Sequence, residues 1–228
     1  MRTGFIAMLK EQLTEIYQLL FECFGPQFWW PGQTQFEIIT GAILTQNTSW
    51  KNVERAIANL KSADLLTPEK LNAAELSKLA ELIRPAGYFN IKARRLKNFL
   101  TWLFENYAGQ LERLQQLNTD RFREELLSVK GIGPETADSI LLYAFEREVF
   151  VVDAYTARIA ARHMLIEQGA DYEQLRDLFQ SNLASDVKLF NEYHALLVWL
   201  GKNFCRPKAE CSICPLQKLP HRLDLEHF

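Results

Sequence analysis

The helical spacing of the apolar residues, which runs through nearly the whole chain, most constrains the fold. Hydrophobic side chains recur every three or four positions, and no alternating stretch is long enough to indicate a strand. We therefore predict an all-α protein whose helices are separated by short Gly- and Pro-containing breaks, without a low-complexity linker. The expected helices cover residues 4–23, 35–46, 49–61, 74–84, 90–106, 120–128, 134–146, 154–168, 171–183 and 186–203.

Length and composition indicate a globular protein that folds without disulfides. A chain of 228 residues with 48% hydrophobic content can bury a sizeable core. Three of the four cysteines lie within ten residues, which argues against a secreted disulfide framework. The N-terminal segment is interrupted by Lys10, Glu11 and Glu15, so we interpret it as an amphipathic helix and not as a signal peptide. We expect a cytoplasmic protein, associated with the nucleoid if bacterial, with no membrane partner.

The charge distribution leaves a nucleic-acid partner open. The formal net charge of -2 argues mildly against one, but local charge decides contact with phosphates. The window from Arg84 to Phe104 holds five Lys or Arg residues and no acid, together with Tyr88 and Phe89. Such a run is either a solvated helix face or a phosphate-binding surface.

A glycine-rich turn between two expected helices is the first candidate site. Val129-Lys130-Gly131-Ile132-Gly133 is followed by Pro134 at a helix start, a position that proline favours. Two glycines separated by one apolar residue allow a tight hairpin with positive φ. The next helix then directs unpaired N–H groups outward, which suits a phosphate. The alternative is a plain helix-to-helix turn.

A single aspartate after this helix is the candidate catalytic residue. The apolar run at 149–152 leads directly into Asp153, which places the carboxyl at the edge of a core and at an expected helix N-cap. N–H groups at a helix start favour the ionised form. Asp153 is therefore suited to stabilise a cationic sugar, although it could serve as a cap alone.

Four sequence blocks together resemble the helix-hairpin-helix DNA glycosylases of the endonuclease III superfamily. They are VKGIGPETA at 129–137, VVDAYTAR at 151–158, GAILTQNT at 41–48 and GYFNIKARRL at 87–96. The resemblance implies two helical lobes with a central cleft, one at 26–133 and one joining 1–25 to 134–228. It also implies a monomer that flips a nucleotide out of double-stranded DNA containing damaged bases. The DNA-contacting residues would be Lys130, Gly131, Ile132 and Gly133 in the hairpin, together with Asn47 and with Gln46, which would fill the gap left in the base stack.

The hairpin departs from the bifunctional members of that family at one position. Those members carry a lysine that attacks the sugar, and the matching residue here is Glu135, which cannot form a Schiff base. The departure favours a monofunctional enzyme in which Asp153 orients or deprotonates water. Three alternatives stay open: a bifunctional glycosylase/lyase on oxidised pyrimidines, a uracil or thymine mismatch glycosylase, and a non-catalytic DNA-binding module.

An aromatic cluster indicates the substrate class. The segment Trp29-Trp30-Pro31, together with Trp50, could form a stacking platform for a cationic base, or it could be ordinary buried core. The combination resembles the 3-methyladenine glycosylase branch, which implies an alkylated purine as substrate. The same resemblance adds Lys202 to the candidate pocket residues, which also include Glu135 of the hairpin.

The C-terminal cysteines resemble the iron–sulfur loop of the superfamily, here within residues 201–221. Cys205, Cys211 and Cys214 match three ligands, but Pro220 stands where the fourth cysteine is expected and His221 follows it. The resemblance implies a [4Fe-4S] cluster with His221 as an uncertain fourth ligand. A Cys₃His zinc site and a loop that binds no metal are the alternatives. Cys23 is expected to be a buried, small apolar residue.

Overall fold

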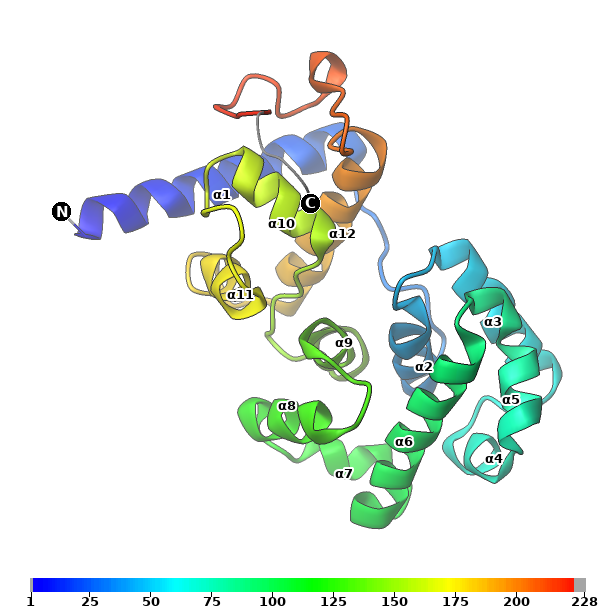
Figure 1. Ribbon diagram of the computed structural model, residues 1–228. Helices are drawn as coiled ribbons and strands as arrows, with labels where there is room; N and C mark the ends of the chain where they lie inside the picture. Colours follow the sequence, from blue (N-terminus) through cyan, green and yellow to red (C-terminus); the bar gives the residue numbers. More distant parts are fainter. Residues whose placement is uncertain (1, 224–228) are drawn as a thin grey trace. The chain divides into compact units, whose positions relative to one another are not determined.

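The computed structural model describes residues 2–223, with side chains from residue 8 onward, and this part of the chain contains helices and no strand (Figure 1). The all-α prediction is confirmed. The chain divides into two compact units, each of which is described separately below. We call residues 30–147 the inserted unit, and residues 1–29 with 148–228 the terminal unit.

The inserted unit is built around one buried helix, α2 (Gln35–Thr45). Thr34 caps this helix by accepting a hydrogen bond from the Glu37 N–H, and Ile39 and Ile43 are shielded from solvent. The other helices of the unit are α3 (Trp50–Ser62), α4 (Pro68–Ala73), α5 (Leu76–Leu82), η1 (Arg84–Ala86), α6 (Phe89–Tyr107), α7 (Leu111–Gln115), α8 (Thr119–Ser128), α9 (Pro134–Ser139) and the π-helical turn η2 (Ile140–Ala144). Helices α3, α6, α9 and η2 pack directly on α2.

The terminal unit packs three helices around α12. Its helices are α1 (Arg2–Phe24), α10 (Ala154–Arg162), α11 (Tyr172–Gln180), α12 (Val187–Asn203) and η3 (Cys211–Ile213). Phe150, from the apolar run before Asp153, stacks on Phe179 of α11 with ring centroids 4.4 Å apart. α10 lies close against α12 because position 201 is glycine: a Cβ there would be 2.6 Å from the Cβ of Tyr155. This close packing positions the start of α10.

Several expected boundaries differ from the structure. Helices α4 and α7, of six and five residues, are too short to show a helical period and were not expected. The helix expected over 154–168 ends at Arg162, and the segment that follows places Met164 at a φ of 58°. The helix expected from residue 120 begins one residue earlier, at Thr119, and is capped by Asn118, whose side chain accepts a hydrogen bond from the Arg121 N–H.

Two further expectations concern the unit boundary and Cys23. We expected the break between lobes after Gly133, whereas the compact unit continues to Arg147 because α9 and η2 pack on α2. Cys23 is exposed and not buried, since it lies on the outward side of α1. Within residues 2–223, no helix has the length and apolar character needed to cross a bilayer.

Candidate active site

The hairpin at 129–133 joins α8 to α9 as expected. Gly131 has a φ of 100°, and a Cβ there would lie 2.5 Å from Cγ of Arg95, so both backbone and space require glycine. The Ile132 N–H donates to Val129 O at 3.0 Å, and Ile132 is buried. Arg123 of α8 forms a two-bond ion pair with the fully buried Asp138 of α9, at 2.6 and 3.1 Å. The turn is therefore held at a fixed angle between its helices.

The second glycine of the hairpin differs from the expectation of a positive φ. Gly133 has a φ of −98° and is the N-cap of α9, with open space where a Cβ would stand. One left-handed residue is enough to close the turn, so Gly133 keeps an ordinary extended backbone. Lys130, Gly133 and Glu135 are exposed around the turn, where a phosphate could approach the start of α9.

Gln46 is tied to the hairpin within the inserted unit. Its Nε2 donates to Gly131 O at 3.1 Å and to Thr136 Oγ1 at 2.8 Å, and its Oε1 accepts from the Arg95 guanidinium. Asn47, the next residue, is exposed with a φ of 54°. The structure thus brings the block at 41–48 and the hairpin together, two segments that the sequence only suggested were related in function.

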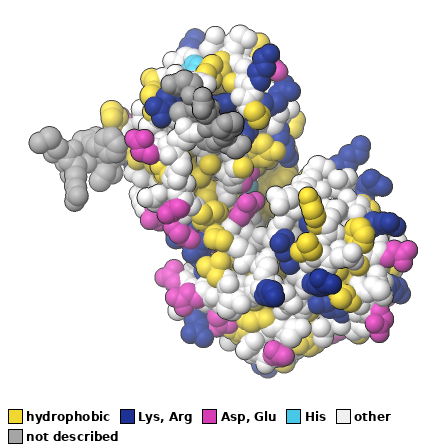
Figure 2. Space-filling model, viewed as in Figure 1, with side chains coloured by type: hydrophobic (Ala, Val, Ile, Leu, Met, Phe, Trp, Pro, Cys, Tyr) yellow, Lys and Arg dark blue, Asp and Glu magenta, His cyan; other side chains and the backbone are white. Residues whose placement is uncertain are grey.

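The basic window from Arg84 to Phe104 is largely structural. Lys92 is 1% exposed and donates to Leu44 O and Ala86 O, at 2.9 and 2.7 Å. Burial, with the nearby charge of Arg95, lowers the pKa of Lys92 to about 8. Lys97 donates to three carbonyl groups at the end of α4. The run is therefore not a continuous phosphate-binding face, and Lys and Arg side chains are scattered over the visible surface of the molecule (Figure 2).

Two of the predicted pocket tryptophans meet in the inserted unit. Trp30 contacts Trp50 edge-on, with ring centroids 4.8 Å apart, and lies 4.9 Å from the ring of Tyr143. The two tryptophan rings lie over α2 at Gly41, where a Cβ would be 3.3 Å from Nε1 of Trp30 and 3.5 Å from the ring of Trp50. Tyr143 was not among the predicted pocket residues, because its contact with Trp30 joins positions far apart in the sequence; it lies in the π-helical turn η2.

The remaining predicted pocket residues are distributed over both units. Pro31 and Glu135 are exposed residues of the inserted unit. Trp29 belongs to the terminal unit, as does Lys202, an exposed residue in the last turn of α12. Of the other predicted site residues, Trp30 and Trp50 belong to the inserted unit and Asp153 to the terminal unit.

Asp153 caps α10, as the sequence predicts. Its Oδ1 accepts hydrogen bonds from the Thr156 N–H at 2.8 Å and from the Thr156 hydroxyl at 2.9 Å. Its Oδ2 lies 3.8 Å from Nε2 of His194, a buried residue of α12. Thr156 and His194 were not among the predicted site residues, because nothing in their local sequence marks them.

The surroundings of Asp153 favour its ionised form. Burial of the carboxyl group would raise its pKa, but the interaction with His194 and the two Thr156 donors outweigh this and hold the pKa below its usual value. A carboxylate held ionised in a shielded position can stabilise positive charge on a sugar or accept a proton from water. This is the chemistry expected of the candidate catalytic residue.

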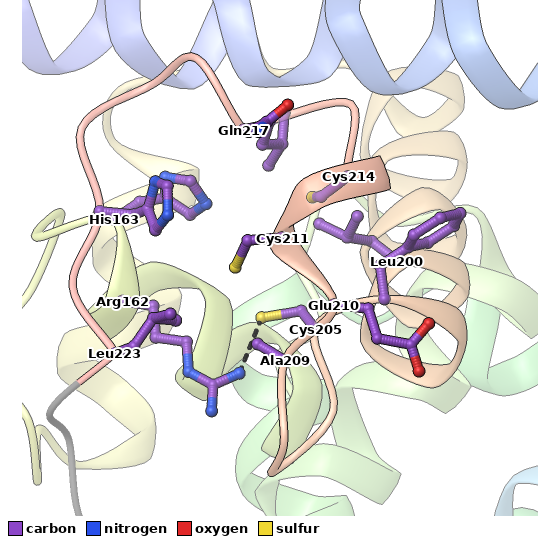
Figure 3. Close-up of a pocket in the computed structure, with 13 residues that line it drawn as sticks. Arg162, His163, Leu200, Cys205, Ala209, Glu210, Cys211, Cys214, Gln217 and Leu223 are labelled. Carbon is purple, nitrogen blue, oxygen red and sulfur yellow. Dashed lines mark hydrogen bonds between the residues drawn. The ribbon is translucent and has the colours of Figure 1, made fainter.

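The three C-terminal cysteines line one pocket in the terminal unit (Figure 3). His163 and His221 line the same pocket, with ring centroids 5.7 Å apart. The sequence analysis did not include His163, which follows the last residue of α10. Burial raises the pKa of the Cys214 thiol to about 11, with the neighbouring cysteines adding to the effect.

Buried arginines of α10 hold this cysteine loop. Arg158 donates to Cys205 O at 2.6 Å and to Gly201 O at 3.1 Å. Arg162 donates to the loop carbonyls of Arg206 and Pro207, at 2.7 and 2.9 Å, and to Cys205 Sγ at 3.2 Å. The loop backbone is thus fixed by hydrogen bonds from the protein itself.

The donor set of the pocket bears on what it could bind. No three His, Cys, Asp or Glu side chains within residues 2–223 are placed to hold a metal ion. A zinc ion requires ligands that converge on one point, whereas each cysteine of a [4Fe-4S] cluster binds a different iron. Three thiols beside a guanidinium, with two imidazoles in the same pocket, fit the dispersed ligand set of a cluster better than a single zinc ion.

Comparison with known proteins identifies the family of the chain. Residues 40–185 match the model of the HhH-GPD superfamily of base excision DNA repair proteins. The chain is 51% identical over 210 residues to a provisionally assigned DNA repair glycosylase of Methanocaldococcus jannaschii, covering 91% of this chain and 95% of the relative.

Solved structures give the same result. The chain is similar to the H. pylori 3-methyladenine DNA glycosylase MagIII bound to 1,N6-ethenoadenine, with a TM-score of 0.72 and 32% identity over 85% of this chain and 97% of that one. It also shares the fold of endonuclease III in a non-covalent DNA complex, with a TM-score of 0.80 and 21% identity over 94% and 95% of the two chains. The chain is a DNA glycosylase of the HhH-GPD family, within the endonuclease III superfamily.

Proposed function

We propose that this protein is a monofunctional glycosylase of base excision repair, acting on double-stranded DNA that contains an alkylated purine such as 3-methyladenine. It would hydrolyse the N-glycosidic bond of a flipped base and leave an abasic site. The observation that carries this proposal is the shielded, ionised carboxylate of Asp153, whose Oδ1 is occupied by Thr156.

In this mechanism Asp153 acts through its second oxygen. As the bond to the base breaks, positive charge develops on the sugar, and a nearby carboxylate stabilises it. The same oxygen can accept a proton from the attacking water. Alkylated purines such as 3-methyladenine are cationic and leave readily, so the enzyme needs no strong general acid.

The available amines support hydrolysis over strand cleavage. Position 135 in the hairpin is an exposed glutamate. Lys92 has a lowered pKa, which suits a nucleophile, but it is 1% exposed and bonded to two carbonyl groups. Lys130 precedes the turn, whereas the lysine of the family's bifunctional members follows it, at the position of Glu135. A lyase step therefore lacks its nucleophile at the matching position.

The aromatic rings of the inserted unit support the substrate class. Trp30, Trp50 and Tyr143 form a contiguous group of π-faces, which attract a cationic base. The H. pylori relative with 32% identity is a 3-methyladenine glycosylase bound to a modified adenine. We propose Trp29, Pro31, Glu135 and Lys202 as further residues that contact the base.

DNA would be held at the hairpin. The exposed Lys130 and the N–H groups at the start of α9 suit a phosphate, and Gln46, bonded to Gly131 O, would enter the base stack together with Asn47. Endonuclease III, which has the same fold, has been solved on DNA.

For the cysteine loop we propose a [4Fe-4S] cluster held by Cys205, Cys211 and Cys214, with His221 or His163 as the fourth ligand. The cluster would be structural and would brace the loop without taking part in base removal. Arg162, which already contacts Cys205 Sγ, would stabilise a thiolate there.

The proposal is tested on duplexes containing 3-methyladenine, 7-methylguanine, uracil or thymine glycol, with cleavage measured before and after alkali. Base release from the methylated purines, with strand breaks only after alkali, is the expected result. Strand breaks on thymine glycol without alkali would contradict the monofunctional assignment. Release of uracil alone would contradict the substrate class.

A further inference from the structure

His194 lies beside the candidate catalytic carboxylate although nothing in the sequence connects the two residues. It is a buried residue of α12, 6% exposed, and its Nε2 is 3.8 Å from Oδ2 of Asp153. The two helices approach closely enough for this because Gly201 leaves room for Tyr155. The pairing is therefore a product of the packing of α10 on α12.

The two oxygens of Asp153 have different surroundings. Oδ1 is engaged by both donors of Thr156 and forms the helix cap. Oδ2 makes neither of these bonds and faces His194. Oδ2 is thus the oxygen suited to the reaction, and the imidazole is the group that faces it from the neighbouring helix.

We propose that His194 is a positioning residue that keeps Oδ2 of Asp153 ionised and oriented during base release. The inference rests on the proposed function of Asp153. A separation of 3.8 Å is too long for a direct hydrogen bond, so the effect is electrostatic. At this distance, in a poorly solvated site, the His194 imidazole lowers the pKa of Asp153 and so stabilises its carboxylate form.

Other ionisable groups on the helices around His194 are engaged elsewhere. On α12, Tyr193 donates its hydroxyl to Leu13 O of α1, and Glu192 accepts from the Gln27 N–H. On α1, burial raises the pKa of Tyr17, which remains neutral. On α10, Arg158 and Arg162 donate to the cysteine loop. Of the ionisable groups on these helices, His194 is the one that lowers the pKa of Asp153.

This arrangement has a consequence for the pH dependence of the reaction. Burial alone would raise the pKa of Asp153, and the His194 and Thr156 interactions reverse that effect. Without the imidazole, burial is opposed by Thr156 alone. The carboxyl then takes up a proton at a higher pH, and the acid limb of the rate profile moves upward.

The experiment compares the wild-type protein with His194→Phe, which keeps a ring in the packed site but removes the ring nitrogen that faces Oδ2 of Asp153. Single-turnover base release from a methylated-purine duplex is followed between about pH 4 and pH 8, where carboxyl and imidazole groups titrate. We expect the acid limb of His194→Phe to lie about one pH unit higher or more. The matched control is Tyr193→Phe, which loses the bond to Leu13 O and should lower thermal stability without moving the acid limb.

The outcomes separate this inference from the proposed function. A lost reaction in Asp153→Asn with an unshifted acid limb in His194→Phe would overturn the role of His194 and leave that of Asp153. Full activity in Asp153→Asn would overturn the proposed function itself. If His194→Phe does not fold, His194→Gln provides the same test, because glutamine carries an amide donor but no charge.

Discussion

Helix α10 carries charged side chains at both ends, and the two ends use them differently. At its start, Asp153 bonds Thr156 through one oxygen and leaves the other facing His194. At its end, Arg158 and Arg162 direct their guanidinium groups into the cysteine loop, where they meet backbone carbonyls. In the proposed mechanism the carboxylate at the start of α10 takes part in the reaction, whereas the arginines nearer its end hold the cysteine loop.

Because the two sets of side chains have different partners, changes at the start of α10 should affect activity and changes nearer its end should affect stability. A substitution of Asp153 can remove the carboxylate charge and still preserve the helix cap. Substitutions at its end leave buried carbonyl groups without donors, which costs stability. The same helix can therefore be probed at either end, with opposite expected readouts.

The largest effect is expected for Asp153→Asn. Asparagine is an equally good helix cap, so α10 should stay folded while the negative charge is lost. We expect base release to fall by roughly 10²- to 10⁴-fold, the usual contribution of such a group. Single-turnover kinetics with circular dichroism checks both points. A folded variant with wild-type rates would remove Asp153 from the mechanism.

Gly201→Ala should displace the start of α10 through packing alone, without removing any charged side chain. The new Cβ would stand 2.6 Å from the Cβ of Tyr155, which cannot move without moving α10. Overpacking of this kind costs about 1–3 kcal/mol, and a shift of about 1 Å at Asp153 could slow the reaction by up to 10²-fold.

The matched control for stability is Gly133→Ala, where a Cβ meets nothing within 4 Å and φ is −98°. It should unfold at nearly the wild-type denaturant concentration. If Gly201→Ala proves as stable as this control, the close packing of α10 on α12 is not what positions Asp153.

The sequence predicts a residue's role where that role depends on neighbouring positions, and does not predict it where the role depends on residues far along the chain. Asp153 and Gly131 were found because their local sequence carries the signal: a carboxylate after an apolar run, and a glycine that a tight turn requires. His194 and Tyr143 were missed because each gains its role from a residue far along the chain. Burial of Lys92, within an apparently basic surface, likewise depends on the carbonyls of other segments.

At the other end of α10, Arg162→Met should affect stability more than activity. The change keeps an apolar stem but leaves the carbonyls of Arg206 and Pro207 without their donor. We expect a loss of roughly 2 kcal/mol in the free energy of unfolding. Limited proteolysis should show earlier cleavage in the loop. The control is Arg206→Met, an exposed partner of Glu210, which should cost less than about 1 kcal/mol.

The smallest effect on stability is expected for Cys211→Ala, although its effect on metal content should be large. Cys211 lines the loop pocket, so its loss should abolish binding of iron and acid-labile sulfide by protein purified without oxygen. Because Arg158 and Arg162 hold the loop backbone independently, the free energy of unfolding should fall by less than about 1 kcal/mol.

Cys23→Ala is the matched control, since Cys23 is exposed on α1 and is not among the residues that line the pocket. It should keep its iron. Wild-type protein without iron would contradict the proposed cluster. Iron loss accompanied by complete unfolding in Cys211→Ala would show instead that Arg158 and Arg162 cannot hold the loop without the cluster.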